Sequence, residues 1–584
     1  MSRDNIVKHD GSVDWSYIGN NLTTSIIINV KNYGTVGNGA NDDTAAIQSA
    51  INFVESRGGG TLYFPKGSYL IKSLLYLATN VRLLGDIGAE ILVDDSFVFQ
   101  TGIDTDNFIK TKGHNEKFSA SSRTKNITLQ NMRFRANRTS ITERDFISIA
   151  NTENFIIDTC DFIFENHCRV IALDIRAAYK GVTVRNCRFI QNYTTVDHVS
   201  GFIWVRNSGG FNLIDGANSD NFASDVNISK CYFEKATGDE HIAVWGWYST
   251  VHNIRIDSCT FVQDDATAIT NAYIISAYTD GANTTANLSN ILITNNIFDI
   301  KRIYTAAIGI NAGTYINQIY NIITDNNIIN LKTSDITGSP GFILCKNASG
   351  VISKNQCINV GVTKLTYGIH ETPSSTSVVD NYLDGGIGGI TNGFAYCDTV
   401  RDNFVTNVNK GASYCKNVIG NTFTGITTTG VEFGASNVTA TVFNNNITLS
   451  NVAGIYAIQL LNFASATISA YVKGNMITTT VSSQKAFYGE CTSGSYILEG
   501  NIKYGSGAFI WVWNGCKVER MSNNKVDDTN YDTLYAGRPS VNDLENAIPI
   551  GHMAWNTTAV APSIGWKKIA AGYGSDKWLE IKTS

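Results

Sequence analysis

The chain has 584 residues, of which 43% are hydrophobic and 16% charged, so it has ample apolar material for a core and too little charge for intrinsic disorder. Its formal net charge of -5 gives no general attraction to nucleic acid or anionic lipid, and no stretch approaches the roughly 18 consecutive apolar residues of a membrane helix. We therefore expect no nucleic acid partner and no membrane insertion.

The N-terminal part of the chain predicts a cap for a larger structure. In the run NDDTAAIQSAINFVESRGGG, Asp42 or Asp43 is suited to cap a helix. An apolar stripe from Ala46 to Val54 marks the buried face of this helix, and Gly58 to Gly60 end it. The next run, TLYFPKGSYLI, is typical of two strands joined by a turn. We expect residues 25–100 to form this cap and the first coils.

From residue 125 a short pattern recurs: two polar residues, an alternating apolar strand, Asn or Cys, and then an aromatic residue. Its clear copies are KNITLQNMRF, NFIIDTCDF, GVTVRNCRF, DVNISKCYF, NIRIDSCTF and NILITNNIF, and weaker copies continue to about Asn501. A single core stops growing near about 250 to 300 residues, so a chain of this length must divide or stack repeats. The repeat predicts an all-β fold, a right-handed parallel β-helix, over residues 101–530.

The eleven cysteines are scattered, without a CxxC pair or zinc-ligand spacing, so the sequence predicts no disulfide framework, no metal site and no cofactor. Cysteines at matching repeat positions are expected to form an interior ladder of small apolar side chains. They are Cys160, Cys187, Cys231 and Cys259. Asn296 and Asn327 occupy the same position in later copies, which predicts that an amide ladder continues the stack.

In each coil a second strand follows the aromatic residue, as in RVIALDIR, GFIWVRNS and HIAVWGWYS. If its aliphatic side chains point inward, alternation places the remaining side chains on the outer face. These are Asp174, Arg176, Trp204, Arg206, Trp245 and Trp247. Exposed Trp side chains beside Arg side chains indicate a surface that binds a sugar chain. Burial of the Trp residues by a neighbouring subunit, and simple solvation of the Arg residues, are the alternatives.

The turns that enter this strand carry acidic residues in successive coils, which would stack about 4.8 Å apart. Closely spaced carboxylates raise one another's pKa, and glycosidic cleavage uses a pair of them. Because they adjoin the Trp-bearing strands, we select Asp174, Asp239 and Glu240 as catalytic residues, although Asp is also common in ordinary turns. The further predicted substrate-binding residues are Asp197, His198 and His241.

The spacing of the acidic residues leaves the reaction open. Carboxyl groups one coil apart suit a retaining hydrolase, and groups two coils apart lie near the upper limit for inversion. In β-elimination, His198, His241 or a Tyr would instead remove a proton beside a uronic acid carboxylate. We favour hydrolysis, because an acidic surface repels a uronate unless an Arg or a metal offsets the charge. A site between subunits would use later residues: His370 with Glu371, Asp398, or Glu432.

The run from Val30 to Ile71, VKNYGTVGNGANDDTAAIQSAINF followed by GGTLYFPKGSYLI, resembles the opening of pectate-lyase-like β-helix proteins, and most of all phage tailspikes. Residues 531–584 are expected to form a small C-terminal β element, in which Gly551–Ile581 is similar to terminal elements of phage tail proteins. The remaining segment, residues 1–24, begins with a polar stretch that predicts no export signal. The resemblance implies a homotrimeric virion protein, attached to a phage tail or baseplate protein, that acts at the bacterial surface.

Three functions follow from the residues and the resemblance together. The first is a tailspike that binds and hydrolyses capsular polysaccharide or O-antigen. The second is a receptor-binding protein that uses the same Trp-rich face without cleavage. The third is a pectinase-like enzyme or a polysaccharide lyase of the same fold, and the expected lack of an export signal counts against a secreted pectinase.

Overall fold

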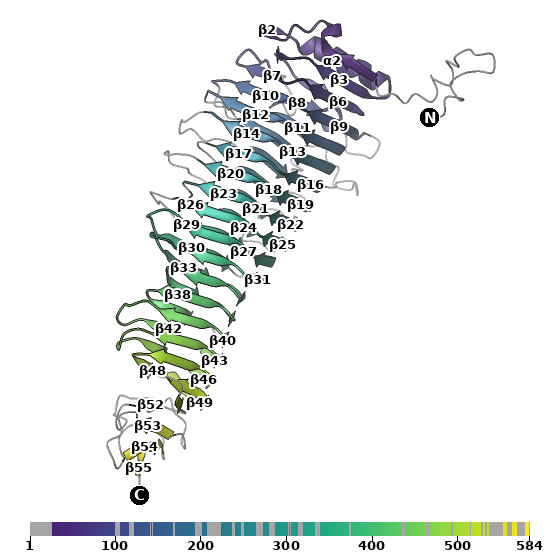
Figure 1. Ribbon diagram of the computed structural model, residues 1–584. Coiled ribbons are helices and arrows are strands. Elements are labelled where there is room, and N and C mark those ends of the chain that lie inside the picture. The colour runs from purple at the N-terminus through teal and green to yellow at the C-terminus, as the bar shows by residue number, and fades with distance from the viewer. Residues whose placement is uncertain are drawn as a thin grey trace, which may run out of the picture. The chain divides into compact units, whose positions relative to one another are not determined.

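The computed structural model describes residues 26–99, 106–115, 122–139, 142, 144–166, 170–192, 201–206, 223–235, 240–246, 250–263, 273–279, 287–301, 303, 305–312, 319–332, 339–372, 375–434, 438–462, 468–491, 494–513, 516–526, 529–531, 534–535, 553–556, 563–568 and 578–582. The chain divides into two compact units, residues 1–193 with 210–222 and residues 194–209 with 223–584. Each unit is a stack of parallel strands, as the strand series in Figure 1 show.

Near the start of the first unit, a helix packs on its first strands. In α2 (Thr44–Ser56) the apolar stripe predicted from the sequence is buried, with Ile47 and Val54 at 0% exposure. At its N-terminus the Asp42 carboxylate accepts a hydrogen bond from the Thr44 backbone N–H. The three glycines that follow the helix all have positive φ, the conformation that lets the chain reverse into the first strand of the next coil.

The strands of the first unit form parallel stacks. They are β1 (Ile26–Asn29), β2 (Asn38–Asp42), β3 (Gly60–Phe64), β4 (Gly67–Leu70), β5 (Leu75–Leu77), β6 (Val81–Gly85), β7 (Ala89–Asp94), β8 (Asn107–Thr111), β9 (Thr124–Gln130), β10 (Arg133–Asn137), β11 (Arg144–Asp158), β12 (Asp161–Glu165), β13 (Val170–Arg185) and β14 (Arg188–Gln191), with short helical turns η2 (Val30–Tyr33) and η3 (Lys112–Asn115). In β10, β12 and β14 the repeat aromatics Phe134, Phe162 and Phe189 lie in register, with ring centroids 5.0 and 4.9 Å apart.

The second unit repeats the same coil. Its strands are β15 (Ile203–Arg206), β16 (Ala223–Ser229), β17 (Tyr232–Lys235), β18 (Ile242–Gly246), β19 (Val251–Asp257), β20 (Thr260–Gln263), β21 (Tyr273–Thr279), β22 (Leu288–Thr294), β23 (Ile297–Ile300), β24 (Ala306–Ala312), β25 (Ile319–Asp325), β26 (Ile328–Leu331), β27 (Gly341–Lys346), β28 (Ala348–Ser353), β29 (Gln356–Asn359), β30 (Leu365–Thr372), β31 (Ser375–Val379), β32 (Tyr382–Asp384), β33 (Ile390–Ala395), β34 (Thr399–Arg401), β35 (Phe404–Thr406), β36 (Val408–Ser413), β37 (Asn417–Ile419), β38 (Thr422–Ile426), β39 (Thr429–Gly434), β40 (Val438–Phe443), β41 (Asn446–Leu449), β42 (Tyr456–Asn462), β43 (Ile468–Lys473), β44 (Met476–Thr479), β45 (Lys485–Cys491), β46 (Gly494–Glu499), β47 (Ile502–Gly505), β48 (Ala508–Trp513), β49 (Cys516–Ser522), β50 (Asn524–Val526) and β51 (Thr529–Tyr531).

From β15 to β50 every third strand pairs in parallel with the next, so each coil contributes one strand to each of three stacks, whereas β51 pairs antiparallel with β50. One stack contains β19, β22 and β25, the second contains β20, β23 and β26, and the third contains β18, β21 and β24 (Figure 1). The predicted all-β architecture, a right-handed parallel β-helix, is confirmed. Near the C-terminus β52 (Leu534–Tyr535), β53 (Met553–Asn556), β54 (Ser563–Lys568) and β55 (Trp578–Lys582) form a separate four-stranded sheet.

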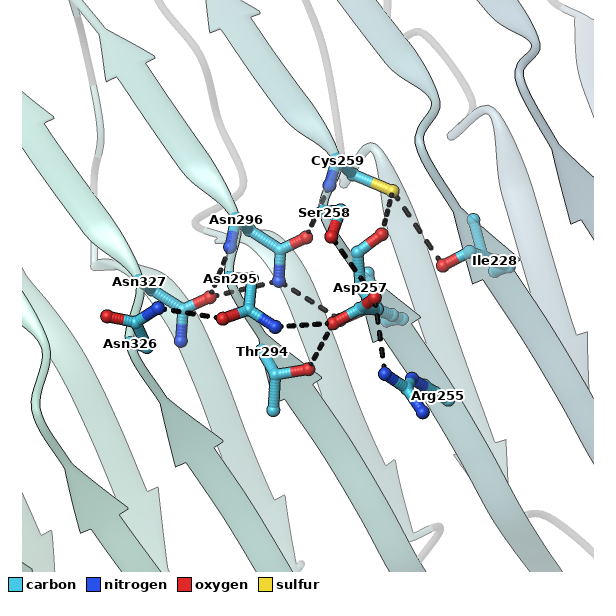
Figure 2. Close-up of polar contacts among 11 residues, drawn as sticks. Ile228, Arg255, Asp257, Ser258, Cys259, Thr294, Asn295, Asn296, Asn326 and Asn327 are labelled. Atoms are coloured by element: carbon cyan, nitrogen blue, oxygen red, sulfur yellow. Dashed lines mark hydrogen bonds and ion pairs between the residues drawn. The ribbon is translucent and has the colours of Figure 1, made fainter.

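An amide ladder runs through the interior of the second unit. The Asn296 side chain accepts a hydrogen bond from the Cys259 backbone N–H, and Asn327 accepts from both the backbone and the side chain of Asn296 (Figure 2). The predicted shared position of Cys and Asn is therefore confirmed. The same contacts continue through buried residues in later coils, namely Asn355, Asn381, Asn403, Asn421, Asn445, Asn475, Asn501 and Asn524.

A carboxylate ties two coils together at the corner beside this ladder. Asp257 accepts hydrogen bonds from Thr294 Oγ1 (2.6 Å) and Asn295 Nδ2 (2.8 Å) of the next coil, and Arg255 Nη2 lies 3.3 Å away (Figure 2). Burial pushes the pKa of Asp257 upward, but these hydrogen bonds and the Arg255 charge bring it below its ordinary value. The ionised carboxylate therefore holds the corner closed.

We expect this corner to make the fold sensitive to acid. Because the folded-state pKa of Asp257 is depressed, its contribution to stability is present above the unfolded value of about 3.9 and is lost as the pH falls through the folded value. The Asp257→Asn variant should have a lower thermal midpoint at pH 7 and a smaller loss of midpoint between pH 5 and 3. Asp380→Asn, at an exposed corner, is the control. An unchanged midpoint in Asp257→Asn at pH 7 would contradict the prediction.

Candidate functional site

Aromatic side chains from three successive coils meet on the stack that contains β15, β18 and β21. Arg206 lies in register with Trp245, and Trp245 with Tyr278. The ring centroids of Trp204 and Trp245 are 4.6 Å apart, and those of Trp245 and Tyr278 are 5.0 Å apart. The Arg206 guanidinium carbon lies 4.9 Å from the Trp204 ring and 5.9 Å from the Trp245 ring. We call these four side chains the Trp ladder.

The exposure expected for this face is only partly found. The aliphatic side chains that alternate with the Trp ladder on the same strands are buried as predicted, for example Val205 and Val244 at 0% exposure. Trp204 and Arg206, however, are each only 8% exposed, whereas Trp245 is half-buried. The prediction that Trp204 and Arg206 are exposed is therefore wrong, because the cation–π stack packs them against one another. Trp245 and Tyr278 are the accessible rings of the ladder.

Asp174 and Arg176 lie together on β13 in the first unit, and they are not exposed either. Asp174 is 0% exposed and accepts a hydrogen bond from Arg176 Nε. Arg176 is 9% exposed, and its Nη2 lies 3.6 Å from Asp145 Oδ2. Two carboxylates therefore share one guanidinium, which is how buried charges are normally accommodated. The expected outward, solvent-facing placement of Asp174 and Arg176 is wrong, because both faces of this strand are buried.

Glu240 and His241 precede β18 and lie in different environments. Glu240 is half-buried. Burial raises the pKa of Tyr273, and the charge of Glu240 raises it further, so the Tyr273 hydroxyl remains protonated beside this carboxylate.

His241 is 0% exposed, with ring centroids 5.6, 6.3 and 5.8 Å from those of Phe202, Phe233 and Phe261. Its expected contact with substrate disagrees with this burial in the aromatic interior. Backbone hydrogen bonds hold His241 between neighbouring coils, since its N–H donates to the Ile274 carbonyl and its carbonyl accepts from the Phe202 N–H. Four other predicted site residues lie outside the described residues: Asp197, His198, Asp239 and Trp247.

The acidic residues named for a site between subunits lie in the second unit. Glu371 is 0% exposed, and its Oε2 accepts from the Asp398 backbone N–H at 3.4 Å. Glu432 is 3% exposed and accepts a hydrogen bond of 2.8 Å from Lys410 Nζ. Sequence reasoning did not select Tyr278, although it lies in register with Trp245 in the next coil. Alignment of these strands by register would have found it.

In the part of the chain that the structure describes, two other kinds of feature are absent. There, His, Cys, Asp and Glu side chains do not gather in groups of three or more that could hold a metal ion. The described helices are too short or too polar to cross a membrane.

The chain matches known β-helix proteins over part of its length. The family model described as "Rhamnogalacturonase A/epimerase, pectate lyase-like" matches residues 27–264. The resemblance to pectate-lyase-like proteins is thereby confirmed over that segment. This segment includes α2, β13, Glu240 and the Trp-bearing strands.

Among curated proteins, plasmin and fibronectin-binding protein A of Streptococcus pneumoniae is 26% identical over 420 residues, which are 61% of this chain and 56% of that protein. Mannuronan C5-epimerase AlgE3 of Azotobacter vinelandii is 44% identical over 64 residues, 10% of this chain and 4% of the epimerase. The chain thus spans less than two thirds of the length of these relatives.

Solved structures with a similar trace include surface proteins. The adhesin PfbA of Streptococcus pneumoniae aligns with a TM-score of 0.36 and 15% identity over 85% of this chain and 94% of that chain. The tailspike of E. coli bacteriophage HK620, in complex with a pentasaccharide, aligns with a TM-score of 0.42 and 13% identity over 84% of this chain and 80% of that chain.

Proposed function

We propose that this protein is a phage tailspike that binds a bacterial surface polysaccharide, either capsule or O-antigen, and cleaves it by glycosidic hydrolysis. The observation that carries the proposal is the Trp ladder, in which the accessible rings of Trp245 and Tyr278 lie one coil apart and Arg206 backs Trp245. Aromatic rings beside hydrogen-bonding groups are what a sugar chain requires from a binding surface.

In this proposal Glu240 is the carboxylate that acts on the substrate. It is half-buried, it precedes the strand that carries Trp245, and the protonated Tyr273 hydroxyl lies within its electrostatic reach. A hydrolase needs a second carboxylate, and Asp239 is the proposed partner. Asp174 is given no role at the Glu240 site in this proposal, because Arg176 pairs with it at 0% exposure within the first unit.

The names of the curated relatives support a polysaccharide ligand. Several are mannuronan C5-epimerases, and one is alginate lyase 7, 41% identical over 64 residues. Because these relatives are named for action on mannuronan and alginate, β-elimination is the second candidate reaction for this chain. The 26% identity to a plasmin- and fibronectin-binding protein over 61% of the chain favours binding without cleavage as the other alternative.

One experiment separates these reactions. The purified protein is incubated with alginate, rhamnogalacturonan and a panel of purified capsular and O-antigen polysaccharides, and chain length is followed by size-exclusion chromatography. Hydrolysis should shorten the chains and form new reducing ends without unsaturated sugars. Shorter chains that end in unsaturated uronic acids would show that the protein cleaves by β-elimination and not by hydrolysis. Binding of a polysaccharide with undiminished chain length would leave only the non-catalytic function.

A trimer and an attachment to the phage tail are also part of the proposal. Apolar side chains on one stack of the second unit are exposed, and they lie on the same outer row of the register. They are Ile297 (44%), Ile328 (38%), Phe404 (40%) and Met476 (41%). Rows of this kind are suited to contact other copies of the chain. Sedimentation should show a homotrimer, and a stable monomer would contradict it.

Loss of the central ring should weaken polysaccharide binding. Trp245→Ala removes the ring that contacts both Trp204 and Tyr278, and we expect an increase in Kd of about tenfold, equivalent to about 1.4 kcal/mol. The matched control is Tyr320→Ala, which removes a ring that is 42% exposed on β25 in a different stack. Isothermal titration with a polysaccharide from the panel measures both variants. Equal weakening in the two variants would contradict a specific role for Trp245.

A further inference from the structure

A second row of aromatic side chains lies further along the same unit. The His370 and Tyr396 ring centroids are 5.4 Å apart, and those of Tyr396 and Tyr414 are 4.9 Å apart with nearly parallel planes. His370 is half-buried on β30, whereas Tyr396 and Tyr414, directly after β33 and β36, are 48% and 40% exposed. We call these three residues the Tyr ladder. Exposed aromatic side chains that cluster in this way mark a contact surface.

The backbone of the Tyr ladder is held in an unfavourable conformation. Tyr396 and Tyr414 have φ of 59° and 58°, a region that bulky side chains rarely adopt. The next residues, Cys397 and Cys415, are buried, so each corner turns its Tyr outward between inward neighbours. A Cβ at Gly434 would lie 2.5 Å from Tyr414 Cε1, so the ring can rest there only on a glycine. At other corners this conformation is taken mostly by Asn, for example Asn347 and Asn444, so a bulky ring in it is unusual.

Hydrogen-bonding groups adjoin the rings. Lys410 Nζ donates to Glu432 Oε1 at 2.8 Å, and Ser413 Oγ donates to Asn392 Oδ1 at 2.9 Å. Burial raises the pKa of Tyr414, and the charge of Glu432 raises it further, so the Tyr414 hydroxyl stays protonated at neutral pH. Glu432 and Ser413 are buried, and their half-buried partners Lys410 and Asn392 are the polar groups that remain partly accessible. Aromatic rings with polar groups nearby suit a sugar chain better than an apolar partner.

The Tyr ladder lies on the same outer face as the Trp ladder. Trp204 is in register with Ala243, and this row continues strand by strand through β21, β24 and β27 to His370 on β30. Tyr396 follows Ala395, the next member of the row. Four coils separate the strand of Trp245 from that of His370, which is about 19 Å along the stack.

We propose that the Tyr ladder is a second glycan-binding segment that holds the same polysaccharide chain at a distance from Glu240. The proposal rests on the proposed function and adds the substrate class: an extended polymer that contacts both ladders at once. Ligands that reach only the Trp ladder lose this second set of contacts. Because the two segments are joined on one rigid stack, a long chain that binds one is held close to the other.

The test compares long and short ligands in a variant that removes both exposed rings. Tyr396→Asn with Tyr414→Asn keeps a residue type that tolerates positive φ, as at Asn347 and Asn444 in other corners. The control is Tyr320→Asn, which removes a ring that is 42% exposed on β25 in another stack. Thermal unfolding verifies that all variants are folded.

Binding is measured with a full-length polysaccharide from the panel and with oligosaccharides released from it. The double Asn variant should bind the polymer at least tenfold more weakly and the short fragments as the wild type does. Trp245→Ala should weaken both. If the double variant binds the polymer with wild-type affinity, or loses as much affinity for short fragments as for the polymer, the proposal of a second binding segment is overturned. Either result would leave the proposed function intact. A wild-type protein that binds no polysaccharide in the panel would overturn both proposals.

Discussion

Replacement of Asn403 by alanine is expected to lower the free energy of unfolding by about 3 kcal/mol. Asn403 is 2% exposed in the amide ladder of the second unit. Its Oδ1 accepts from the backbone N–H and the side chain of Asn381, and its Nδ2 donates to the Val378 carbonyl and to Asn421 Oδ1. Alanine supplies none of these groups, so the Asn381 N–H loses its acceptor where water has no access, and a buried group without a partner costs about 1 to 3 kcal/mol.

The control for this variant is Asn409→Ala, which removes one exposed hydrogen bond from Thr427 Oγ1 that water can replace. Urea unfolding followed by circular dichroism should show a clearly lower midpoint for Asn403→Ala and a nearly unchanged midpoint for the control. Equal midpoints in the two variants would mean that the ladder does not hold the coils together.

The sequence repeat was sufficient to predict the coil and its interior. A Phe that closes each copy predicts a stack, and Phe233 and Phe261 lie 4.9 Å apart as that prediction requires. Equivalence of Cys and Asn two residues before this Phe predicts one continuous ladder, and Asn296 indeed accepts from Cys259. These features follow from local alternation and from the parallel register, which bring equivalent residues of neighbouring coils together.

The candidate site could be predicted only in part, because alternation gives the side of a strand and not its solvent exposure. Trp245 lies beside Trp204 as expected, but Asp174 is fully buried by an ion pair that the repeat pattern does not reveal. His241 lies in a corner, where the backbone is not extended and alternation no longer applies. The sequence did contain a signal for Tyr396 and Tyr414, since a Tyr-Cys pair recurs there one coil apart.

The ion pair of Asp174 with Arg176 also bears on the choice of catalytic residue. A general acid must exchange its proton with the substrate, whereas the Asp174 carboxylate pairs with a guanidinium at 0% exposure, where a substrate does not reach it. Glu240 is half-buried, and it lies before the strand that carries Trp245. Of the predicted catalytic carboxylates that the structure describes, we therefore propose Glu240 as the one that acts on a chain bound at the Trp ladder.

Glu240→Gln is consequently expected to reduce the rate of polysaccharide cleavage by about 10² to 10⁴-fold, because the amide keeps the shape of the side chain but cannot donate or accept the catalytic proton. Polymer affinity should change less than twofold, since the ladder rings are untouched. Glu153→Gln is the control, because Glu153 is an exposed carboxylate on β11 whose Oε2 lies 3.5 Å from Lys125 Nζ. Initial rates of reducing-end formation measure the effect in both variants. If the Glu240→Gln variant cleaves at the wild-type rate, other carboxylates catalyse the reaction. Equal losses in both variants would indicate a general effect of removing charge.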